Sequence, residues 1–300
     1  MKIIVIGLGN QGLKRKKFAK GDFIASVDPF NKSADYKKIT DVPLNLYDSA
    51  LICTPDKIKL NLIKYCLKNK KHVLVEKPLL ISKKYFITLK NLAKKNKLIL
   101  YTGYNHRFEP HFIKMKKLLN SGKLGKIYSC KMFYGNGTAK LVYNSTWKDK
   151  SNGIIADLGS HLLDTFIFWF GKKNLNLESI KKYKFENRSP DHALLNFSRK
   201  NFSLSLEMSL CMWRNHFTCD ILAEKGSAHI TSLCKWGPSE FYYRKRKLPS
   251  GKPKETKIKI IKKDPTWKLE YNFFKKQVLQ KKRTNLDNDL WISNIVKNLK

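Results

Sequence analysis

The feature that most constrains this chain is a glycine motif directly after a short apolar run. Residues 2–7 read KIIVIG, which is typical of a buried strand, and residues 7–12 read GLGNQG. The pattern G-x-G-x-x-G is weak evidence by itself, but a preceding strand and a following helix give it meaning. We therefore expect the first strand-to-helix turn of a dinucleotide-binding domain.

Each glycine of this motif has its own task. Gly7 permits the tight turn, Gly9 lets the backbone approach a pyrophosphate, and Gly12 lets the helix pack closely against the strand. The helix opens near Asn10 and Gln11, where free N–H groups and the positive end of the helix dipole favour phosphate. These five residues are predicted to bind a cofactor, although a glycine turn without a ligand is the alternative.

An acidic residue closes the second predicted strand. Residues 23–28 read FIASVD, so Asp28 lies sixteen residues after Gly12. This position fits the acid that binds the ribose hydroxyls of a dinucleotide. Because a carboxylate would repel a 2′-phosphate, we expect NAD, with NADP possible because Lys32 is close in sequence.

The spacing of apolar runs changes near residue 105. Up to there, short strands alternate with amphipathic helices, which predicts a parallel sheet covered on both faces. Beyond it, longer segments alternate with period two, which predicts an open, mostly antiparallel sheet. The expected fold class is α/β, with an N-terminal Rossmann dinucleotide-binding domain over residues 1–104. A C-terminal α+β domain follows over residues 105–300, with a last helix able to pack back on the first domain.

Composition excludes some classes of protein. The chain has 300 residues, 42% hydrophobic and 28% charged, and no run approaches the roughly 18 apolar residues of a membrane span. Its six cysteines form no C-x-x-C pair, so we expect free thiols, no structural metal and a cytoplasmic location.

The formal charge of +38, from 61 basic and 23 acidic residues, allows two interpretations. It could attract an anionic partner, or it could be a solvated lysine-rich surface. Basic clusters, among them Arg244–Lys247 and Lys262–Lys263, are dispersed along the chain. Nucleic-acid binding would need a basic stripe with stacking rings, so none is expected, whereas an anionic small substrate is compatible.

Two further motifs follow predicted parallel strands. Thr54 ends the predicted strand over residues 50–54 and Pro55 stops it, and Glu76, Lys77 and a proline come after the next strand. Ligands of open α/β sheets bind at the carboxyl edge, so these four residues are predicted to contact the cofactor. Lys77 could also be an ordinary loop lysine.

The chain resembles the Gfo/Idh/MocA family of NAD(P)-dependent oxidoreductases, named after glucose–fructose oxidoreductase and inositol dehydrogenase. The resemblance rests on segments that occur in the family's order: IGLGNQG, CTPD at 53–56, VEKP at 75–78, GYNHRFEP at 103–110, SGKLGKIY at 121–128, NGIIADLGSHLLD at 152–164 and FTCDILAEKGSAHI at 217–230. One departure is Asn152, which stands where the family usually has the first of two glycines.

The resemblance implies hydride transfer between NAD(P) and a sugar, cyclitol or sugar derivative. It assigns Lys77 to the family's E-K-P motif, and Asp157 and His161 to its D-x-x-x-H motif. It also implies a homodimer or homotetramer that pairs through the outer face of the second sheet.

The residues themselves agree with these assignments. Asp157, His161 and Asp164 are spaced i, i+4 and i+7, so a helix would present them on one face. His161 can accept a hydroxyl proton at neutral pH, Asp157 can fix its tautomer, and Lys77 can stabilise developing alkoxide charge. A metal site, or a histidine merely packed in a core, are the alternatives.

Other polar residues are predicted to bind substrate: Asn105, Arg107, Trp147, Lys148 and Asp164. An ion pair between domains is the alternative for Arg107. The expected activity is dehydrogenation or reduction of a sugar, cyclitol or nucleotide-sugar. The positive charge is compatible with an anionic substrate, for example in surface polysaccharide precursor synthesis. The alternatives are a dinucleotide-binding redox sensor without turnover and a non-redox enzyme that uses NAD transiently.

Overall fold

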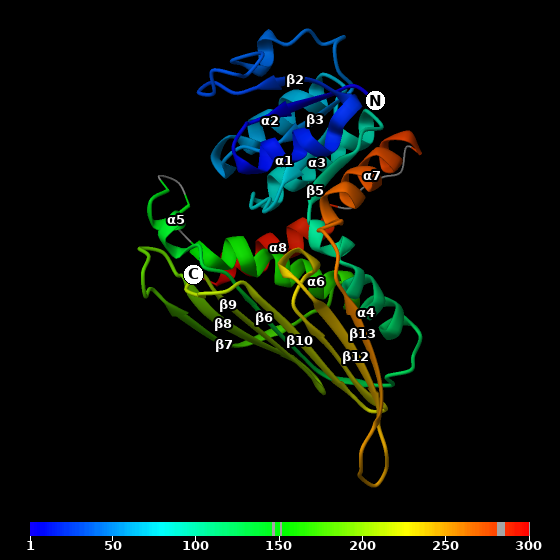
Figure 1. Cartoon of the computed structure of the whole chain (residues 1–300). Helices are drawn as coiled ribbons and strands as arrows, with labels where there is room; N and C mark the ends of the chain where they lie inside the picture. Colours follow the sequence, from blue (N-terminus) through cyan, green and yellow to red (C-terminus); the bar gives the residue numbers. More distant parts are fainter. Residues whose placement is uncertain (146–147, 151, 281–285, 300) are drawn as a thin grey trace. The chain divides into compact units, whose positions relative to one another are not determined.

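The computed structural model describes residues 1–145, 148–150, 152–280 and 286–299, and the chain divides into two compact units. The first comprises Met1–Asn105 together with Thr266–Ile295, and the second comprises His106–Pro265 together with Val296–Lys300. Residues 266–295, expected in the second domain apart from a returning last helix, therefore group with the first unit. Figure 1 labels most of the helices and strands, which are numbered in chain order.

The first unit is built on a five-stranded sheet whose neighbouring strands are parallel, in the order β2-β1-β3-β4-β5. The strands are β1 (Ile3–Ile6), β2 (Phe23–Val27), β3 (Ser49–Ile52), β4 (His72–Glu76) and β5 (Leu100–Gly103). Ile6 pairs with both Val27 and Ile52, and Ile52 pairs with Val75. The carboxyl ends of these strands are therefore level, and the loops that follow them leave from one edge.

Helices cover both faces of this sheet, because every strand is apolar on both sides. The helices of the unit are α1 (Asn10–Ala19), α2 (Asp56–Lys68), α3 (Lys83–Lys95) and α7 (Thr266–Leu279). Ile4 and Ile6 pack in a core with α2 and α3, whereas Ile3 and Val5 pack in a second core with Phe274 of α7. The alternation along β1 follows from the period of two of a strand.

An ion cluster is buried in the first unit. Arg15 of α1 is 2% exposed, and its Nε lies 2.6 Å from Oε1 of Glu76 at the end of β4. Its Nη1 lies 2.6 Å from Oε2 of Glu270 on α7. Burial raises the pKa of Glu270 to about 7, against the opposing effect of Arg15 and with a further increase from Glu76. One guanidinium thus holds two carboxylates from different elements.

The second unit is built on an eight-stranded sheet in the order β13-β12-β11-β10-β6-β9-β8-β7. The strands are β6 (Ile127–Gly135), β7 (Asn176–Tyr183), β8 (His192–Arg199), β9 (Phe202–Ser209), β10 (His216–Ala223), β11 (Gly226–Thr231), β12 (Ser239–Lys245) and β13 (Lys254–Ile260). Neighbours are antiparallel except β6 and β9, which are parallel. The predicted fold class, a parallel sheet followed by a mostly antiparallel one, is confirmed.

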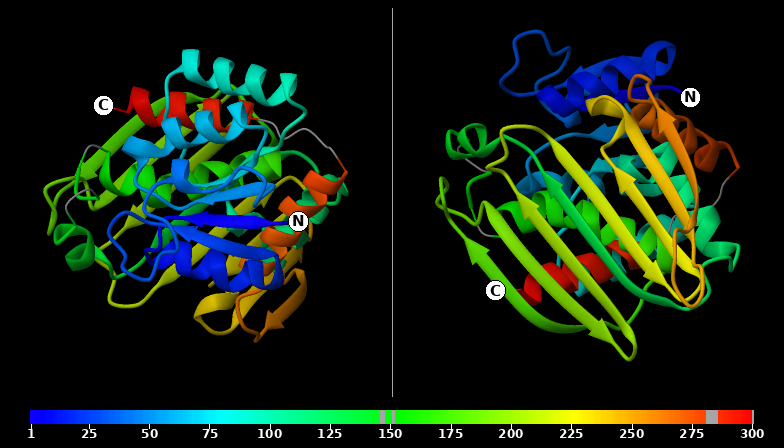
Figure 2. Two further views of the ribbon diagram at one scale, coloured as in Figure 1. Left: turned by 90° about the horizontal axis from the view of Figure 1, so that it is seen from above. Right: turned by 60° about the horizontal axis from the view of Figure 1, so that its bottom comes forward.

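Helices lie on one face of this sheet, as the views in Figure 2 show for α6. The helices of this unit are α4 (Pro110–Asn120), α5 (Ala139–Tyr143) and α6 (Ser160–Phe170), whereas most of α8 (Asp287–Asn298) belongs to the first unit, which extends to Ile295. Trp169 of α6 donates a hydrogen bond to the carbonyl oxygen of Phe112 on α4 at 3.0 Å. Along β10, Cys219 and Ile221 are buried, whereas Leu222 is exposed on the opposite face. The sheet therefore has one packed face and one open face.

We expect Glu270 to make the protein less stable as pH rises from 4.5 to about 7. A carboxyl whose folded pKa exceeds its unfolded pKa binds its proton more tightly in the folded state, so ionisation costs stability over that interval. Glu270→Gln removes this titration. Urea unfolding at about pH 5 and about pH 7.5 should show a smaller loss of unfolding free energy for the variant than for the wild type.

Glu178→Gln is the matched control, because Glu178 is exposed on β7. The control should follow the wild-type profile. A Glu270→Gln protein with the same dependence on pH as the wild type would contradict the account of this cluster.

Candidate active site

The turn after β1 is shaped for close approach of a ligand. Gly7 has a φ of +90°, and a Cβ at Gly12 would lie 1.8 Å from the Gly7 carbonyl oxygen, so neither position accepts a side chain. A Cβ at Gly9 would meet no atom within 4 Å, so this residue faces open space. Helix α1 then begins at Asn10, with Gly9 as its N-cap and no side-chain cap. The turn thus leaves room for a pyrophosphate at the start of α1.

Asp28 lies against this turn as an anion. Its Oδ2 accepts a hydrogen bond from the Leu8 amide at 2.7 Å, and its Oδ1 accepts from the amides of Phe30 and Asn31 at 2.9 and 3.0 Å. Partial burial opposes ionisation, but these amides prevail and lower the pKa of Asp28. The predicted ribose-binding acid is therefore held at the glycine turn by backbone contacts.

The loop after β3 adds a hydroxyl to the same edge of the sheet. In the part of the chain that the structure describes, the Thr54 Oγ1 is buried and has no hydrogen-bond partner. The Thr54 methyl carbon would lie 3.2 Å from a Cβ at Gly7, so this loop adjoins the glycine turn. Pro55 follows and is the N-cap of α2. A buried hydroxyl that lacks a protein partner fits a site for a polar ligand.

The E-K-P turn accepts hydrogen bonds from a buried lysine that the sequence analysis missed. Lys59 of α2 is 3% exposed, and its Nζ donates to the carbonyl oxygens of Pro78 at 3.0 Å and Lys77 at 3.4 Å. The same Nζ lies 2.6 Å from Oδ1 of Asp56. The Lys77–Pro78 peptide is cis. Hydrogen bonds from Lys59 thus connect the turn that carries Lys77 to the start of α2. In the sequence, the i, i+3 spacing of Asp56 and Lys59 was the one indication of this contact.

Glu76 and Lys77, both predicted to contact the cofactor, have different surroundings. Lys77 is half-buried at the end of β4, whereas the Glu76 carboxylate points into the protein and binds Arg15. Asn105 is also buried, and its Nδ2 donates to Oγ1 of Thr266 at 2.7 Å within the first unit. Both Glu76 and Asn105 therefore have internal structural contacts.

In the second unit, Asp157 and His161 lie where a π-helical turn leads into α6. The turn spans Ile155–Gly159, and α6 begins at Ser160. His161 is 7% exposed, and its ring stacks on that of His106 at a centroid distance of 4.0 Å. The Tyr134 ring lies edge-on to His161 at 6.0 Å. π-helical turns occur frequently at functional sites.

Two residues predicted to bind substrate, Arg107 and Asp164, form an ion pair with each other. Asp164 is 1% exposed, and its two oxygens accept hydrogen bonds from Nε and Nη2 of Arg107 at 2.8 and 2.5 Å. Burial raises the pKa of Asp164, and Arg107 opposes this effect. The pair lies entirely within the second unit, so the expectation of an ion pair between domains does not describe this Arg107 contact.

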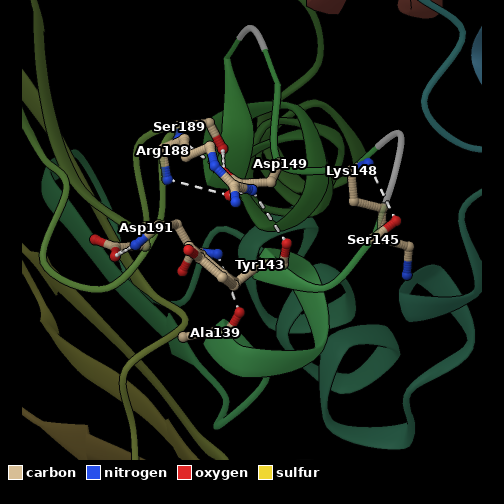
Figure 3. Close-up of polar contacts among 9 residues, drawn as sticks. Ala139, Tyr143, Ser145, Lys148, Asp149, Arg188, Ser189 and Asp191 are labelled. Carbon is tan, nitrogen blue, oxygen red and sulfur yellow. Dashed lines mark hydrogen bonds and ion pairs between the residues drawn. The ribbon is translucent and has the colours of Figure 1, made fainter.

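The loop before α6 is anchored by a buried carboxylate, shown in Figure 3. Asp149 accepts hydrogen bonds from the amide and Oγ of Ser189 at 2.8 and 2.7 Å and from the Arg188 amide at 3.1 Å. Gly153 has a φ of +44°, and a Cβ there would lie 2.3 Å from the Pro190 carbonyl oxygen. These contacts therefore hold the loop that precedes Asp157 in one conformation.

The remaining sequence predictions for this loop concern three residues. Asn152, the departure from the family pattern, donates from Nδ2 to the Val296 carbonyl oxygen at 3.0 Å. Lys148 donates its amide to Oγ of Ser145 at 3.2 Å, next to the Asp149 contacts. Trp147 lies outside the described residues.

Lys235 is a second residue that the sequence analysis missed. It lies on the turn Cys234–Trp236, with its Nζ 4.5 Å from the Trp236 ring centroid and 5.8 Å from the Tyr134 ring centroid. Desolvation lowers the pKa of Lys235, while Asp264, Glu109 and Asp157 act in the opposite direction. Its side chain is nevertheless exposed. An exposed lysine therefore lies beside Tyr134, whose ring contacts His161. In the sequence, this position could have been found only from the neighbouring Lys235 and Trp236 after β11.

Within the described ranges, no three His, Cys, Asp or Glu side chains are grouped so that they could hold a metal ion. None of the helices in those ranges has the length and hydropathy that crossing a membrane would require.

Curated relatives share parts of this sequence. The scyllo-inositol 2-dehydrogenase (NADP(+)) of Bacillus subtilis is 27% identical over 140 residues, which cover 46% of this chain and 38% of that protein. Glucose-6-phosphate 3-dehydrogenase of the same organism is 30% identical over 116 residues, covering 37% and 33%. The matched segments span between a third and two fifths of the length of these two relatives.

The fold is shared with solved structures. Levoglucosan dehydrogenase in complex with NADH has a TM-score of 0.85 and 13% identity, covering 100% of this chain and 95% of that chain. A dehydrogenase from Clostridium difficile has a TM-score of 0.80 and 16% identity, covering 100% and 98%.

Two models of one family match consecutive parts of the chain. Residues 5–104 match the NAD-binding Rossmann fold of the oxidoreductase family Gfo/Idh/MocA, and residues 116–289 match its C-terminal alpha/beta domain. The protein therefore belongs to the Gfo/Idh/MocA family of oxidoreductases.

Proposed function

We propose that this protein is an NAD-dependent dehydrogenase or reductase acting on a hydroxyl or carbonyl group of a sugar, cyclitol or nucleotide-linked sugar. The observation that carries the proposal is His161, buried at the start of α6 and packed on His106 and Tyr134. The two named curated relatives act, by their names, on an inositol and on glucose 6-phosphate. These names support the substrate class.

The residues of the first unit fit a dinucleotide. Gly7, Gly9 and Gly12 with the start of α1 would hold its pyrophosphate, Asp28 would bind a ribose, and Thr54 offers a buried hydroxyl. When bound, NAD supplies the hydride acceptor or donor. An anionic Asp28 favours NAD over NADP, because a 2′-phosphate would meet like charge.

Residues of the second unit would accept and return the proton of the reacting hydroxyl group. We assign His161 as the base that accepts the hydroxyl proton during oxidation and returns it during reduction. The His161 ring stacks on the His106 ring at a centroid distance of 4.0 Å, so protonating both imidazoles at once would bring two like charges together. Asp157 orients the imidazole, and Lys77 stabilises charge on the reacting oxygen, roles that the family resemblance implies.

Lys235 favours an anionic substrate. Lys235 is exposed, and its Nζ lies 5.8 Å from the ring centroid of Tyr134, which contacts His161. A phosphate or carboxylate on the sugar would gain a charge-assisted hydrogen bond there. We propose phosphorylated or nucleotide-linked sugars as substrates, with surface polysaccharide precursor synthesis as the setting.

Replacing the proposed base tests the activity. His161→Asn should lower kcat by about 10²- to 10⁴-fold, the usual contribution of general base catalysis, and leave NADH affinity unchanged. Absorbance at the NADH band with a panel of sugars, sugar phosphates and nucleotide-sugars measures turnover. His216→Asn, at an exposed position of β10, is the matched control and should retain activity. Equal activity of the His161→Asn and wild-type proteins would refute this assignment.

Replacing the proposed anion contact tests the substrate class. Lys235→Gln should raise KM for a phosphorylated substrate by about tenfold or more, the loss of a hydrogen bond to a charged group, with a smaller change for its neutral counterpart. Lys181→Gln, which removes one charge from exposed β7, should change neither value. If KM rises equally for neutral and phosphorylated substrates, Lys235 does not recognise the anion.

A further inference from the structure

The second unit contains a hollow lined by consecutive basic residues at one end of its sheet. Its volume is about 370 Å³, near the lower end of the range for small-molecule sites. Its lining comes from the ends of β10, β11 and β12 and from the turn that leads from β12 to β13. The polar residues of its lining are Ser227, Arg244, Lys245, Arg246, Lys247 and Ser250.

The basic run is held in a fixed shape. Lys245 pairs with Gly226 in the sheet, and the Arg246 amide donates to the Lys225 carbonyl oxygen at 3.0 Å. Nη1 of Arg246 donates to the Glu224 carbonyl oxygen, also at 3.0 Å. The segment thus continues β12 along the β10–β11 hairpin. A guanidinium has five donors, so Arg246 keeps donors for a ligand.

The hollow has an excess of positive charge. Nε of Arg244 lies 2.6 Å from Oε2 of Glu255, so that charge is balanced by a neighbouring strand. Lys245 and Lys247 form no ion pair among the residues that the structure describes. No acidic residue is in the lining. Cations gathered without counter-charges favour an anionic ligand.

A hydroxyl in the lining is oriented by a relay on the open face of the sheet. Nε2 of His229 lies 2.8 Å from Oγ of Ser227, and its Nδ1 lies 2.6 Å from Oδ1 of Asp220. The histidine lowers the pKa of Asp220, which keeps that carboxylate ionised. Ser227 is therefore held in place beside the basic run.

We propose that this hollow binds a small anion bearing phosphate groups, such as the diphosphate of a nucleotide or nucleotide-sugar. Arginine forks, lysine ammonium groups and a fixed hydroxyl are the groups that bind phosphate oxygens. A hollow of about 370 Å³ suits a few phosphate groups, whereas nucleic acid binds along an extended groove with stacking rings. The site is separate from the glycine turn and does not depend on the proposed dehydrogenase activity.

Calorimetric titration of the whole protein with inorganic pyrophosphate tests the site. Saturating NADH is present, so that the glycine turn is filled. The double variant Lys245→Gln/Lys247→Gln should bind pyrophosphate about tenfold or more weakly than the wild type, as expected for the loss of charge-assisted contacts. NADH affinity should be the same in both proteins.

The matched control is Lys262→Gln/Lys263→Gln, which removes the same charge from another exposed basic pair. The control should bind pyrophosphate within about twofold of the wild type, since distant exposed charges are screened by salt. Absence of binding to the wild type at millimolar pyrophosphate, or equal weakening in both double variants, would overturn the proposal.

Discussion

A side chain at Gly12 would place its Cβ 1.8 Å from the Gly7 carbonyl oxygen, and this close packing of α1 on the turn after β1 is the constraint on which the first unit depends. It aims the start of α1 at the edge where the parallel strands end. Asp28 and Thr54 reach the same edge because β1, β2 and β3 end level with one another. A dinucleotide site therefore follows from the backbone, and few side chains are needed to complete it.

The sequence predicted features that have a period or a backbone requirement. The two sheets follow from apolar spacing, and the glycine turn follows from positions that accept no Cβ. Which polar partner each side chain meets could not be predicted, because distant segments supply it. Glu76 was predicted to contact the cofactor, and the structure shows it bound to Arg15. Arg107 and Asp164 were predicted to bind substrate, and the structure shows them bound to each other.

The large positive charge does not have a single cause. Arg15 and Lys59 are buried and hold carboxylates or carbonyl oxygens inside the first unit, so they support structure. Lys235 lies beside the aromatic residues around His161, and Lys245 and Lys247 line a hollow. Net charge alone therefore could not distinguish a solvated surface from specific sites, whereas burial and the partners of each lysine can.

The most direct test of the central claim, that the glycine turn and Asp28 hold NAD, is a fluorescence titration of the purified protein with NADH and with NADPH. The account predicts saturable binding of NADH that is clearly tighter than that of NADPH, because the Asp28 carboxylate faces the turn as an anion. Substitution of Asp28 by Ser should narrow this difference. Tighter binding of NADPH by the wild type would contradict the role given to Asp28, and failure to bind either nucleotide would contradict the proposed function.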